Sequence, residues 1–234
     1  MVFILGLTGS IGMGKSETAR MFRRLGVPVF DADAAVHALM GRGGGAVAAV
    51  EQAFPGAARD GAVDRAALGA RVFGQPAELR RLESIIHPRV QRMQRDFLAR
   101  ATRRRLPLVV LDIPLLFEGR GETRCDATAV VSAPFFVQRQ RVLARPNMTE
   151  EKFQGILRQQ VPDAVKRQRA DFVIATGLGK HAALRQVARI ITMLRRRQGH
   201  AWPAPGRPRP RPSQHPSRRP VHARNRLRHR DHRA

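Results

Sequence analysis

The sequence predicts an α/β protein built on a doubly wound, five-stranded parallel sheet. Five short apolar runs, at 2–8, 26–30, 107–113, 126–131 and 170–175, have the length and composition of buried strands. Segments of helical character separate successive runs, as expected for parallel strands joined by right-handed crossovers. A glycine-rich turn follows the first run, and turns of this kind bind phosphates at the start of a helix.

That first turn reads Gly9-Ser10-Ile11-Gly12-Met13-Gly14-Lys15-Ser16 and has the P-loop spacing G-x-x-x-x-G-K-S. Its glycines let backbone N–H groups fold around an anion without Cβ clashes. The lysine can reach the outer phosphates, and the serine hydroxyl suits Mg²⁺. We therefore predict a nucleoside triphosphate site that comprises Gly9, Gly12, Met13, Gly14, Lys15, Ser16 and Glu17.

The second run leads into Asp31-Ala32-Asp33. Ligands of open α/β sheets gather at the carboxyl ends of the strands, so a carboxylate here should lie near the phosphates. Asp33 is a candidate base for an attacking hydroxyl, or a group that helps to position Mg²⁺. The alternative is helix capping, for which Asp31 is well placed ahead of a helix at 32–40.

Residues 41–105 predict a helical insertion between strands rather than another βα unit. Glycines at 41–45 break the chain, a short helical stretch covers 46–54, and Asp64 is a plausible N-cap of the next helix. A long helix is expected over roughly 77–104, because apolar residues recur there at helical spacing. Pro88 should bend or interrupt it.

The third run ends in Asp112, which is placed to hold Mg²⁺ through water or, alternatively, to cap the following turn. After the fourth run, Pro134 begins a helix on which Arg141 and Arg145, four residues apart, share a face. Such a pair suits phosphate oxygens, whereas a solvated basic face is the alternative. Thr149 is a candidate N-cap for a helical flap at 149–168 that would exclude water during phosphoryl transfer.

Charge separates the end of the chain from the rest. The chain carries a formal charge of +25, and residues 195–234 supply 12 of these charges through 13 arginines and one aspartate. Residues 199–234 contain seven prolines, five histidines and ten arginines, so we expect a disordered tail outside a domain at 1–198. We interpret this composition as a reading-frame shift near residue 199. The alternative is a basic arm for nucleic acid or another polyanion.

Several classes of protein are excluded by the sequence. No apolar run approaches the ~20 residues that a membrane span requires. The sequence opens directly on a strand, without a basic segment or a cleavage site, so we expect a protein that is not exported. The single cysteine, Cys125, rules out an internal disulfide framework. We expect a cytoplasmic protein with no membrane partner and no specific nucleic-acid partner.

Taken together, the motifs resemble the dephospho-coenzyme A kinase family over about residues 1–195. The ordered set that carries the resemblance is Gly6–Ser16, Asp31-Ala32-Asp33, Ile86-His87-Pro88, Leu111–Glu118, Gln138-x-x-Arg141-x-x-x-Arg145 and Arg169–Ile174. The resemblance implies an enzyme with a P-loop kinase fold, in which the insertion at about 41–105 binds substrate and a lid covers about 139–168. It implies transfer of the ATP γ-phosphoryl group to the ribose 3′-hydroxyl of dephospho-CoA, with Mg²⁺ as the metal.

The family pattern also suggests roles for individual residues. By resemblance, Asp33 is the base, and Lys15, Arg141 and Arg145 complete the catalytic set. Substrate would contact Asp33, His87 and Leu115, and the metal would contact Ser16 and Asp112. Ser10, Glu17 and Thr176 depart from the family pattern. Two alternatives stay open at this point: another P-loop small-molecule kinase, and a basic nucleic-acid-binding ATPase.

Overall fold

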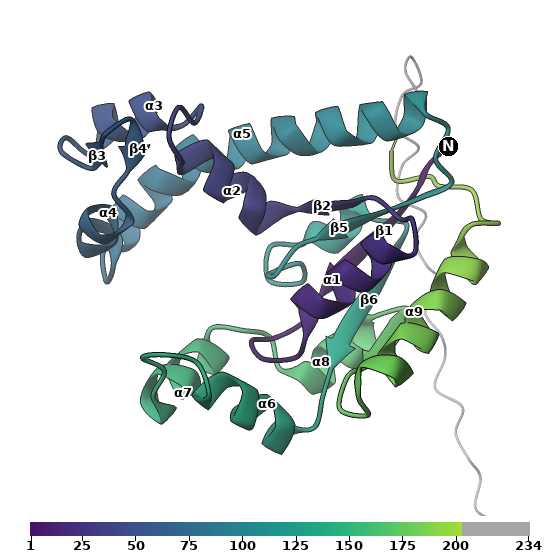
Figure 1. Ribbon diagram of the computed structural model, residues 1–234. Helices are drawn as coiled ribbons and strands as arrows, with labels where there is room; N and C mark the ends of the chain where they lie inside the picture. Colours follow the sequence, from purple (N-terminus) through teal and green to yellow (C-terminus); the bar gives the residue numbers. More distant parts are fainter. Residues whose placement is uncertain (203–234) are drawn as a thin grey trace, which may run out of the picture.

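The computed structural model describes residues 1–202, and its centre is the predicted parallel sheet (Figure 1). The strand order is β2-β5-β1-β6-β7, with every neighbouring pair parallel. The strands are β1 (Phe3–Thr8), β2 (Val29–Asp31), β5 (Leu108–Asp112), β6 (Ala127–Ser132) and β7 (Phe172–Ala175). β1 lies in the middle, so the P-loop leaves the sheet at its centre.

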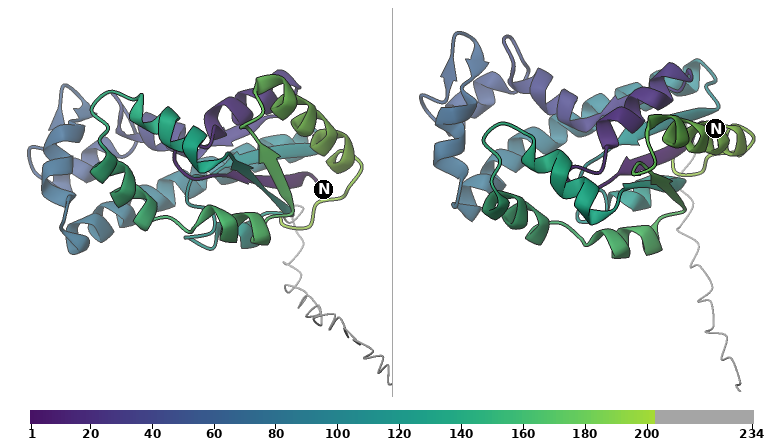
Figure 2. Two further views of the ribbon diagram at one scale, coloured as in Figure 1. Left: turned by 90° about the horizontal axis from the view of Figure 1, so that it is seen from below. Right: turned by 60° about the horizontal axis from the view of Figure 1, so that its bottom comes forward.

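Helices cover both faces of the sheet (Figure 2). Alternate residues of β1 point to opposite sides: Leu5 packs with α1 (Lys15–Arg24) and α9 (Lys180–Leu194), whereas Ile4 packs with α5 (Pro76–Arg103). α8 (Asp163–Arg169) contacts β6 on the α5 side. This is the doubly wound arrangement that the apolar runs predicted.

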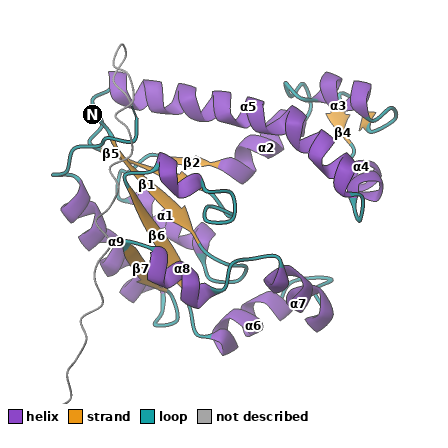
Figure 3. Ribbon diagram, turned by 180° about the vertical axis from the view of Figure 1, so that it is seen from behind, coloured by secondary structure: helices purple, strands orange, loops and turns teal. Residues whose placement is uncertain are grey.

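The insertion has an apolar cluster of its own and lies beyond the end of the sheet (Figure 3). It contains α2 (Ala32–Met40), α3 (Val47–Ala53), β3 (Ala58–Arg59), β4 (Ala62–Val63), α4 (Arg65–Val72) and the first half of α5. The β3–β4 hairpin is absent from the sequence prediction. Its turn residues, Asp60 and Gly61, both have positive φ, and the Asp-Gly pair was the available signal.

Of the two effects expected at Pro88, the interruption is wrong, because α5 is continuous from Pro76 to Arg103, whereas the bend stays a prediction. Proline removes the N–H that would bond to the Ser84 carbonyl. The next residue fixes the helix at this point, because the Arg89 guanidinium donates hydrogen bonds to the Ile85 carbonyl (2.8 Å) and to the Gly45 carbonyl (3.0 Å). The helix also packs on two apolar clusters: one extends across the proline, from Leu82 to Met93, and the other lies wholly after it. Tertiary packing therefore outweighs the local cost of proline.

The lid departs from its prediction in two respects. The flap expected at 149–168 consists of two helices, α7 (Glu150–Arg158) and α8, with Pro162 at the break, although Thr149 does cap α7. α6 (Phe135–Leu143) ends before Arg145, so Arg141 and Arg145 do not share a helical face. Pro146 explains the early end, because a residue that precedes proline disfavours the helical conformation.

The chain remains packed on the domain past residue 198. Asp126 Oδ1 accepts hydrogen bonds from the backbone N–H groups of His200 and Ala201, and Trp202 packs against the α5 side of the sheet. Four residues of the expected disordered tail therefore contact the domain, and the remainder, 203–234, lies outside the described residues. Among residues 1–202, no helix is long and apolar enough to cross a bilayer.

Candidate active site

One lysine and three aspartate side chains meet around one cavity of about 540 Å³ at the carboxyl ends of β1, β2 and β5. Lys15 and Ser16 come from the start of α1, Asp31 and Asp33 from the end of β2 and start of α2, and Asp112 from the end of β5. Asp31 and Asp112 are register partners across the β2–β5 ladder. Strand pairing therefore brings together the carboxylates that the sequence separates by eighty residues.

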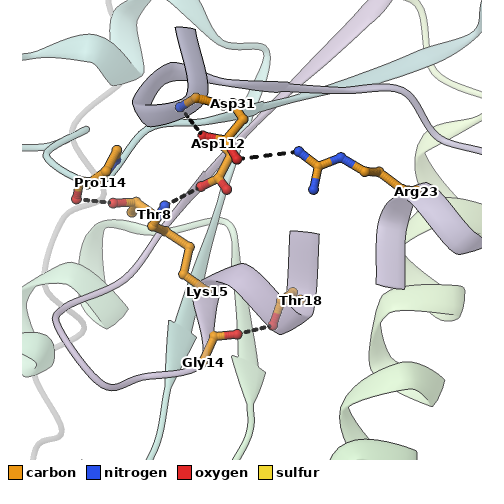
Figure 4. Close-up of polar contacts among 9 residues, drawn as sticks. Thr8, Gly14, Lys15, Thr18, Arg23, Asp31, Asp112 and Pro114 are labelled. Atoms are coloured by element: carbon orange, nitrogen blue, oxygen red, sulfur yellow. Dashed lines mark hydrogen bonds and ion pairs between the residues drawn. The ribbon is translucent and has the colours of Figure 1, made fainter. Parts of the chain in front are cut away.

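Lys15 and Asp112 form a buried ion pair at the base of this cavity (Figure 4). The Lys15 Nζ lies 2.6 Å from Asp112 Oδ1, and the aspartate side chain is 2% exposed. Burial raises the pKa of Asp112, while the nearby Lys15 ammonium acts in the opposite direction. The lysine thus holds the carboxylate in the position expected for a metal-binding acid.

The sequence predicted two roles for Asp31 and Asp33, helix capping and a carboxylate in the site, and the structure gives one role to each. Asp31 Oδ1 accepts a hydrogen bond from the Ala34 N–H (2.9 Å), which makes it the N-cap of α2, and its other oxygen lies 3.5 Å from Arg23. Asp33 is exposed and has no hydrogen bond or ion pair with any residue in the described part of the chain. Its carboxylate is therefore available to a ligand in the cavity.

The P-loop presents unpaired backbone donors at the start of α1. Within residues 1–202, the N–H groups of Gly12, Gly14, Lys15 and Ser16 have no hydrogen-bond acceptor. Gly12 and Gly14 have φ values of 76° and 93°, a region that side chains other than glycine rarely adopt. A Cβ on Gly12 would also lie 2.5 Å from a methyl group of Val142. The loop is thus shaped to bind an anion and is packed directly against α6.

The three departures from the family pattern are all accommodated. Glu17 pairs with Arg20 and, at 3.0 Å, with Lys180, so its charge is balanced beside the phosphate site. The buried Ser10 accepts a hydrogen bond at its carbonyl from Met13 N–H (3.1 Å). Thr176 Oγ1 donates to the Met13 carbonyl (2.7 Å), which connects the β7–α9 loop to the P-loop.

Four sequence-predicted residues lie away from the Lys15 cavity. The Arg141 guanidinium donates to Thr176 Oγ1 (3.0 Å) and to the Thr176 carbonyl (2.9 Å). Arg145, His87 and Leu115 are exposed, and none of the three lines the cavity. Helical spacing selected Arg141 and Arg145, and the family resemblance selected His87 and Leu115. Neither signal says which face of the fold a residue occupies.

A second cavity of about 430 Å³ extends from the first into the insertion. Asp33 and His37 line both cavities. The walls of the second are mostly apolar and come from α2, α4 and α5, with Arg65 at one side: they comprise Val36, Met40, Leu68, Val72 and Leu82. An extended ligand with a polar end near Asp33 and an apolar arm fits this arrangement.

Two glutamines and one buried ion pair carry no role in the sequence prediction. Gln138 and Gln160 bind the backbone of Ile11, and Lys166 is fully buried with its Nζ 2.9 Å from Glu118 Oε1. Gln138 and Glu118 belong to motifs that carry the family resemblance. The motifs do not show that Gln138 contacts Ile11 or that Glu118 pairs with Lys166. Gln160 and Lys166 carried no such signal.

Comparison with known proteins places this geometry among kinases. The family model for dephospho-CoA kinase matches residues 3–179. The dephospho-CoA kinase of Paramagnetospirillum magneticum is 68% identical over 70% of this chain and 77% of its own length. That of Mesorhizobium japonicum is 57% identical over 85% of this chain and its full length. The crystal structure of TT1252 from Thermus thermophilus is 36% identical and superposes with a TM-score of 0.72, over 82% of this chain and 97% of that one.

Proposed function

The chain belongs to the dephospho-CoA kinase family, and from that premise we propose which of its residues carry the reaction. The protein is a kinase of the final step of coenzyme A synthesis and uses ATP to phosphorylate the 3′-hydroxyl of dephospho-CoA. The two alternatives, another small-molecule kinase and a nucleic-acid-binding ATPase, do not fit a family model matched over most of the chain. The observation that carries the residue roles is the shared cavity of Lys15, Asp33 and Asp112.

ATP would be held by the P-loop. The N–H groups of Gly12, Gly14 and Ser16 would donate hydrogen bonds to phosphate oxygens. Gly9 lets the loop lie against β6, because a Cβ at this position would lie 2.8 Å from the Val131 carbonyl. When ATP binds, the Lys15 ammonium would leave Asp112 and bond to the outer phosphates. The exchange is possible because the phosphates, like Asp112, are anionic and would lie in the same cavity. Met13 and Glu17 complete the loop through their backbones.

Mg²⁺ fits the oxygen donors present at the cavity. The Ser16 hydroxyl and the Asp112 carboxylate both line it, and hydroxyl, carboxylate and water oxygens are the ligands this ion prefers. We propose that these two residues hold it, Asp112 through water. When bound, the ion neutralises charge on the phosphates.

Asp33 is proposed as the base for the acceptor. Its carboxylate is free, it lies where the two cavities meet, and it would accept the proton of the 3′-hydroxyl as that oxygen attacks the γ-phosphorus. The remainder of dephospho-CoA would lie in the second cavity, with its diphosphate near Arg65 and its arm along the apolar wall. Closure of the insertion and lid would exclude water, which competes with the acceptor.

The two arginines are proposed to act at different places. Arg141 is bound to Thr176, which in turn bonds to Met13, so it supports the nucleotide side of the P-loop. Arg145 has no partner within residues 1–202 and lies in the lid segment between α6 and α7. We assign to Arg145 the neutralisation of the transferring phosphoryl group when the lid closes.

The test is conversion of dephospho-CoA to coenzyme A with ATP and Mg²⁺, followed by mass spectrometry. We expect Asp33→Ala to lower kcat by at least about 100-fold, because the proton acceptor is lost. ATP binding measured by calorimetry should change little, because Asp33 does not touch the P-loop.

Asp33→Asn is the control for shape, since it keeps the size of the side chain and removes its charge. It should be as slow as Asp33→Ala. Near-normal turnover in Asp33→Asn would remove Asp33 from the role of base, and loss of ATP binding in either variant would reassign it to nucleotide binding.

A further inference from the structure

We propose that Gln138 and Gln160 are positioning residues that together hold the Ile11 backbone and thereby aim the phosphate-binding N–H of Gly12. We call this pair the amide clamp. The Gln138 Nε2 donates to the Ile11 carbonyl at 2.8 Å, and the Ile11 N–H donates to Gln160 Oε1 at 3.1 Å. Both backbone groups of one P-loop residue are therefore bound by side-chain amides.

The geometry of the peptide bond explains what Gln138 does. The Ile11 carbonyl and the Gly12 N–H belong to one planar, trans peptide unit, so they point in opposite directions. By fixing the carbonyl on the α6 side, Gln138 turns the Gly12 N–H away from α6. That N–H is one of the donors left without a protein partner within the described chain. Gln138 is 2% exposed, so water does not compete for its bond.

Gln160 acts on the preceding peptide unit in the same way. The Ile11 N–H shares its plane with the Ser10 carbonyl, which accepts a hydrogen bond from Met13 N–H (3.1 Å) and closes the turn of the loop. Gln160 therefore takes the Ile11 N–H out of the set of phosphate donors. The phosphate-binding donors begin at Gly12 as a result.

The amide clamp also connects the P-loop to both ends of the lid. Gln138 lies in α6, where the lid begins, and Gln160 follows α7, just before Pro162 and α8. A Cβ on Gly12 would lie 3.0 Å from the Gln138 carbonyl, so the α6 backbone lies directly against the loop. Both ends of the lid are therefore hydrogen-bonded to the same P-loop residue, Ile11.

The two glutamines need opposite hydrogen-bonding chemistry, which makes the proposal testable. Gln138 must donate, because its partner is a carbonyl, whereas Gln160 must accept, because its partner is an N–H. Glutamate at 160 keeps the acceptor, but glutamate at 138 places a carboxylate against the Ile11 carbonyl. A role in packing alone would not distinguish these two substitutions of equal size.

The experiment measures kcat and KM for ATP and for dephospho-CoA in the full chain, and it rests on the proposed function. We expect Gln138→Glu and Gln160→Leu each to lower kcat about tenfold, with KM for ATP changing less, because the α1 donors are intact. Gln160→Glu should retain kcat within about threefold. The matched controls Gln140→Glu and Gln159→Leu, at neighbouring positions with no side-chain hydrogen bond in the described structure, should behave as the parent.

Gln138→Leu, which removes the donor without adding charge, replaces Gln138→Glu if the latter fails to fold, as judged by its melting temperature. Normal kcat in a folded Gln138 variant overturns the proposal, as does Gln160→Glu being as slow as Gln160→Leu. Activity of the Lys15→Ala variant shows whether a negative result concerns the amide clamp alone or the proposed function as well. If Lys15→Ala is inactive while the clamp variants are fully active, only the amide clamp is wrong; if Lys15→Ala is active, the P-loop assignment itself fails.

Discussion

At the scale of single residues, the ion pair of Lys15 and Asp112 joins the start of α1 to the end of β5. Asp112 is nearly excluded from solvent, and Lys15 is its hydrogen-bonding partner within the described chain. Burial raises the pKa of Asp112, and the lysine opposes that rise. Removal of Lys15 therefore leaves a buried carboxylate without a counter-charge, which is costly while it remains ionised.

We expect Lys15→Ala to be less stable than the parent, and the deficit to depend on pH. An acid whose pKa is raised in the folded state binds its proton more readily there, so stability falls as pH rises through that pKa. The deficit should be large at pH 8 and shrink as the pH falls toward the unfolded pKa of Asp112. Urea unfolding at several pH values measures it.

The double variant Lys15→Ala/Asp112→Asn is the control, because it removes the titrating group. Its stability relative to Asp112→Asn alone should vary little with pH. A pH-independent deficit in Lys15→Ala would mean that Asp112 does not depend on the lysine for its charge.

The residues of the cavity are predictable from the sequence because of where they stand relative to the strands. Lys15, Ser16, Asp33 and Asp112 all follow buried strands, and parallel strands bring their carboxyl ends to one edge. Arg145 was grouped with Arg141 by helical spacing, which failed because Pro146 ends the helix early. Strand ends are thus predictable from local pattern, whereas helical spacing alone does not show where a helix ends.

At the scale of elements, the buried pair of Glu118 and Lys166 fixes α8 to the loop that follows β5. Lys166 Nζ lies 2.9 Å from Glu118 Oε1, which also accepts a hydrogen bond from the Val161 N–H (2.9 Å). Burial acts to raise the pKa of Glu118, but the bonds from Lys166 and Val161 outweigh it and leave the pKa lowered. Asp163 adds a second bond, to Ser132 of β6 (2.7 Å).

Loss of one partner of this pair should destabilise the protein strongly. We expect Lys166→Met to lower the free energy of unfolding by about 3–5 kcal/mol, because the Glu118 carboxylate loses its counter-charge. Chemical denaturation followed by circular dichroism measures this. The double variant Lys166→Met/Glu118→Leu should recover much of the loss, since no unpaired charge remains. Equal stability of Lys166→Met and the parent would show that the pair contributes nothing.

The same pair changes the interpretation of the lid. Lys166 belongs to the segment expected to form a flap, yet its side chain is fully buried. Sequence pattern does not reveal this, because a lysine on a polar helix is normally exposed and only the tertiary position of Glu118 makes its burial possible. The part of the lid that is free of such bonds lies between α6 and Gln160.

At the scale of the whole molecule, sequence reasoning recovers the architecture and misses the smaller features. The three central strands, β1, β5 and β6, are apolar runs of five or six residues that are buried on both faces, so no alternative period competes with them. The β3–β4 hairpin has strands of two residues, too short to show any period. The boundary at residue 198 followed composition, but Trp202 packs through contacts that composition does not describe.

We predict that a chain ending at residue 202 is more stable than one ending at 198. The longer chain keeps the bonds from the His200 and Ala201 N–H groups to Asp126 and the packing of Trp202. The melting temperatures of the two chains measure how much residues 199–202 stabilise the domain. Trp202→Ala in the longer chain separates the effect of packing from that of hydrogen bonding. Equal melting temperatures would show that residues 199–202 add no stability.

The position of β1 has a consequence for how the chain is made. β1 is synthesised first, yet its partners in the sheet come much later, since Phe3 pairs with Leu108 and Leu5 with Ala127. The insertion lies between them and its apolar cluster is complete at Met93. On a ribosome, where domains form in the order in which they emerge, the insertion is therefore expected to fold first. The P-loop takes its shape only after β5 and β6 have enclosed the strand that precedes it.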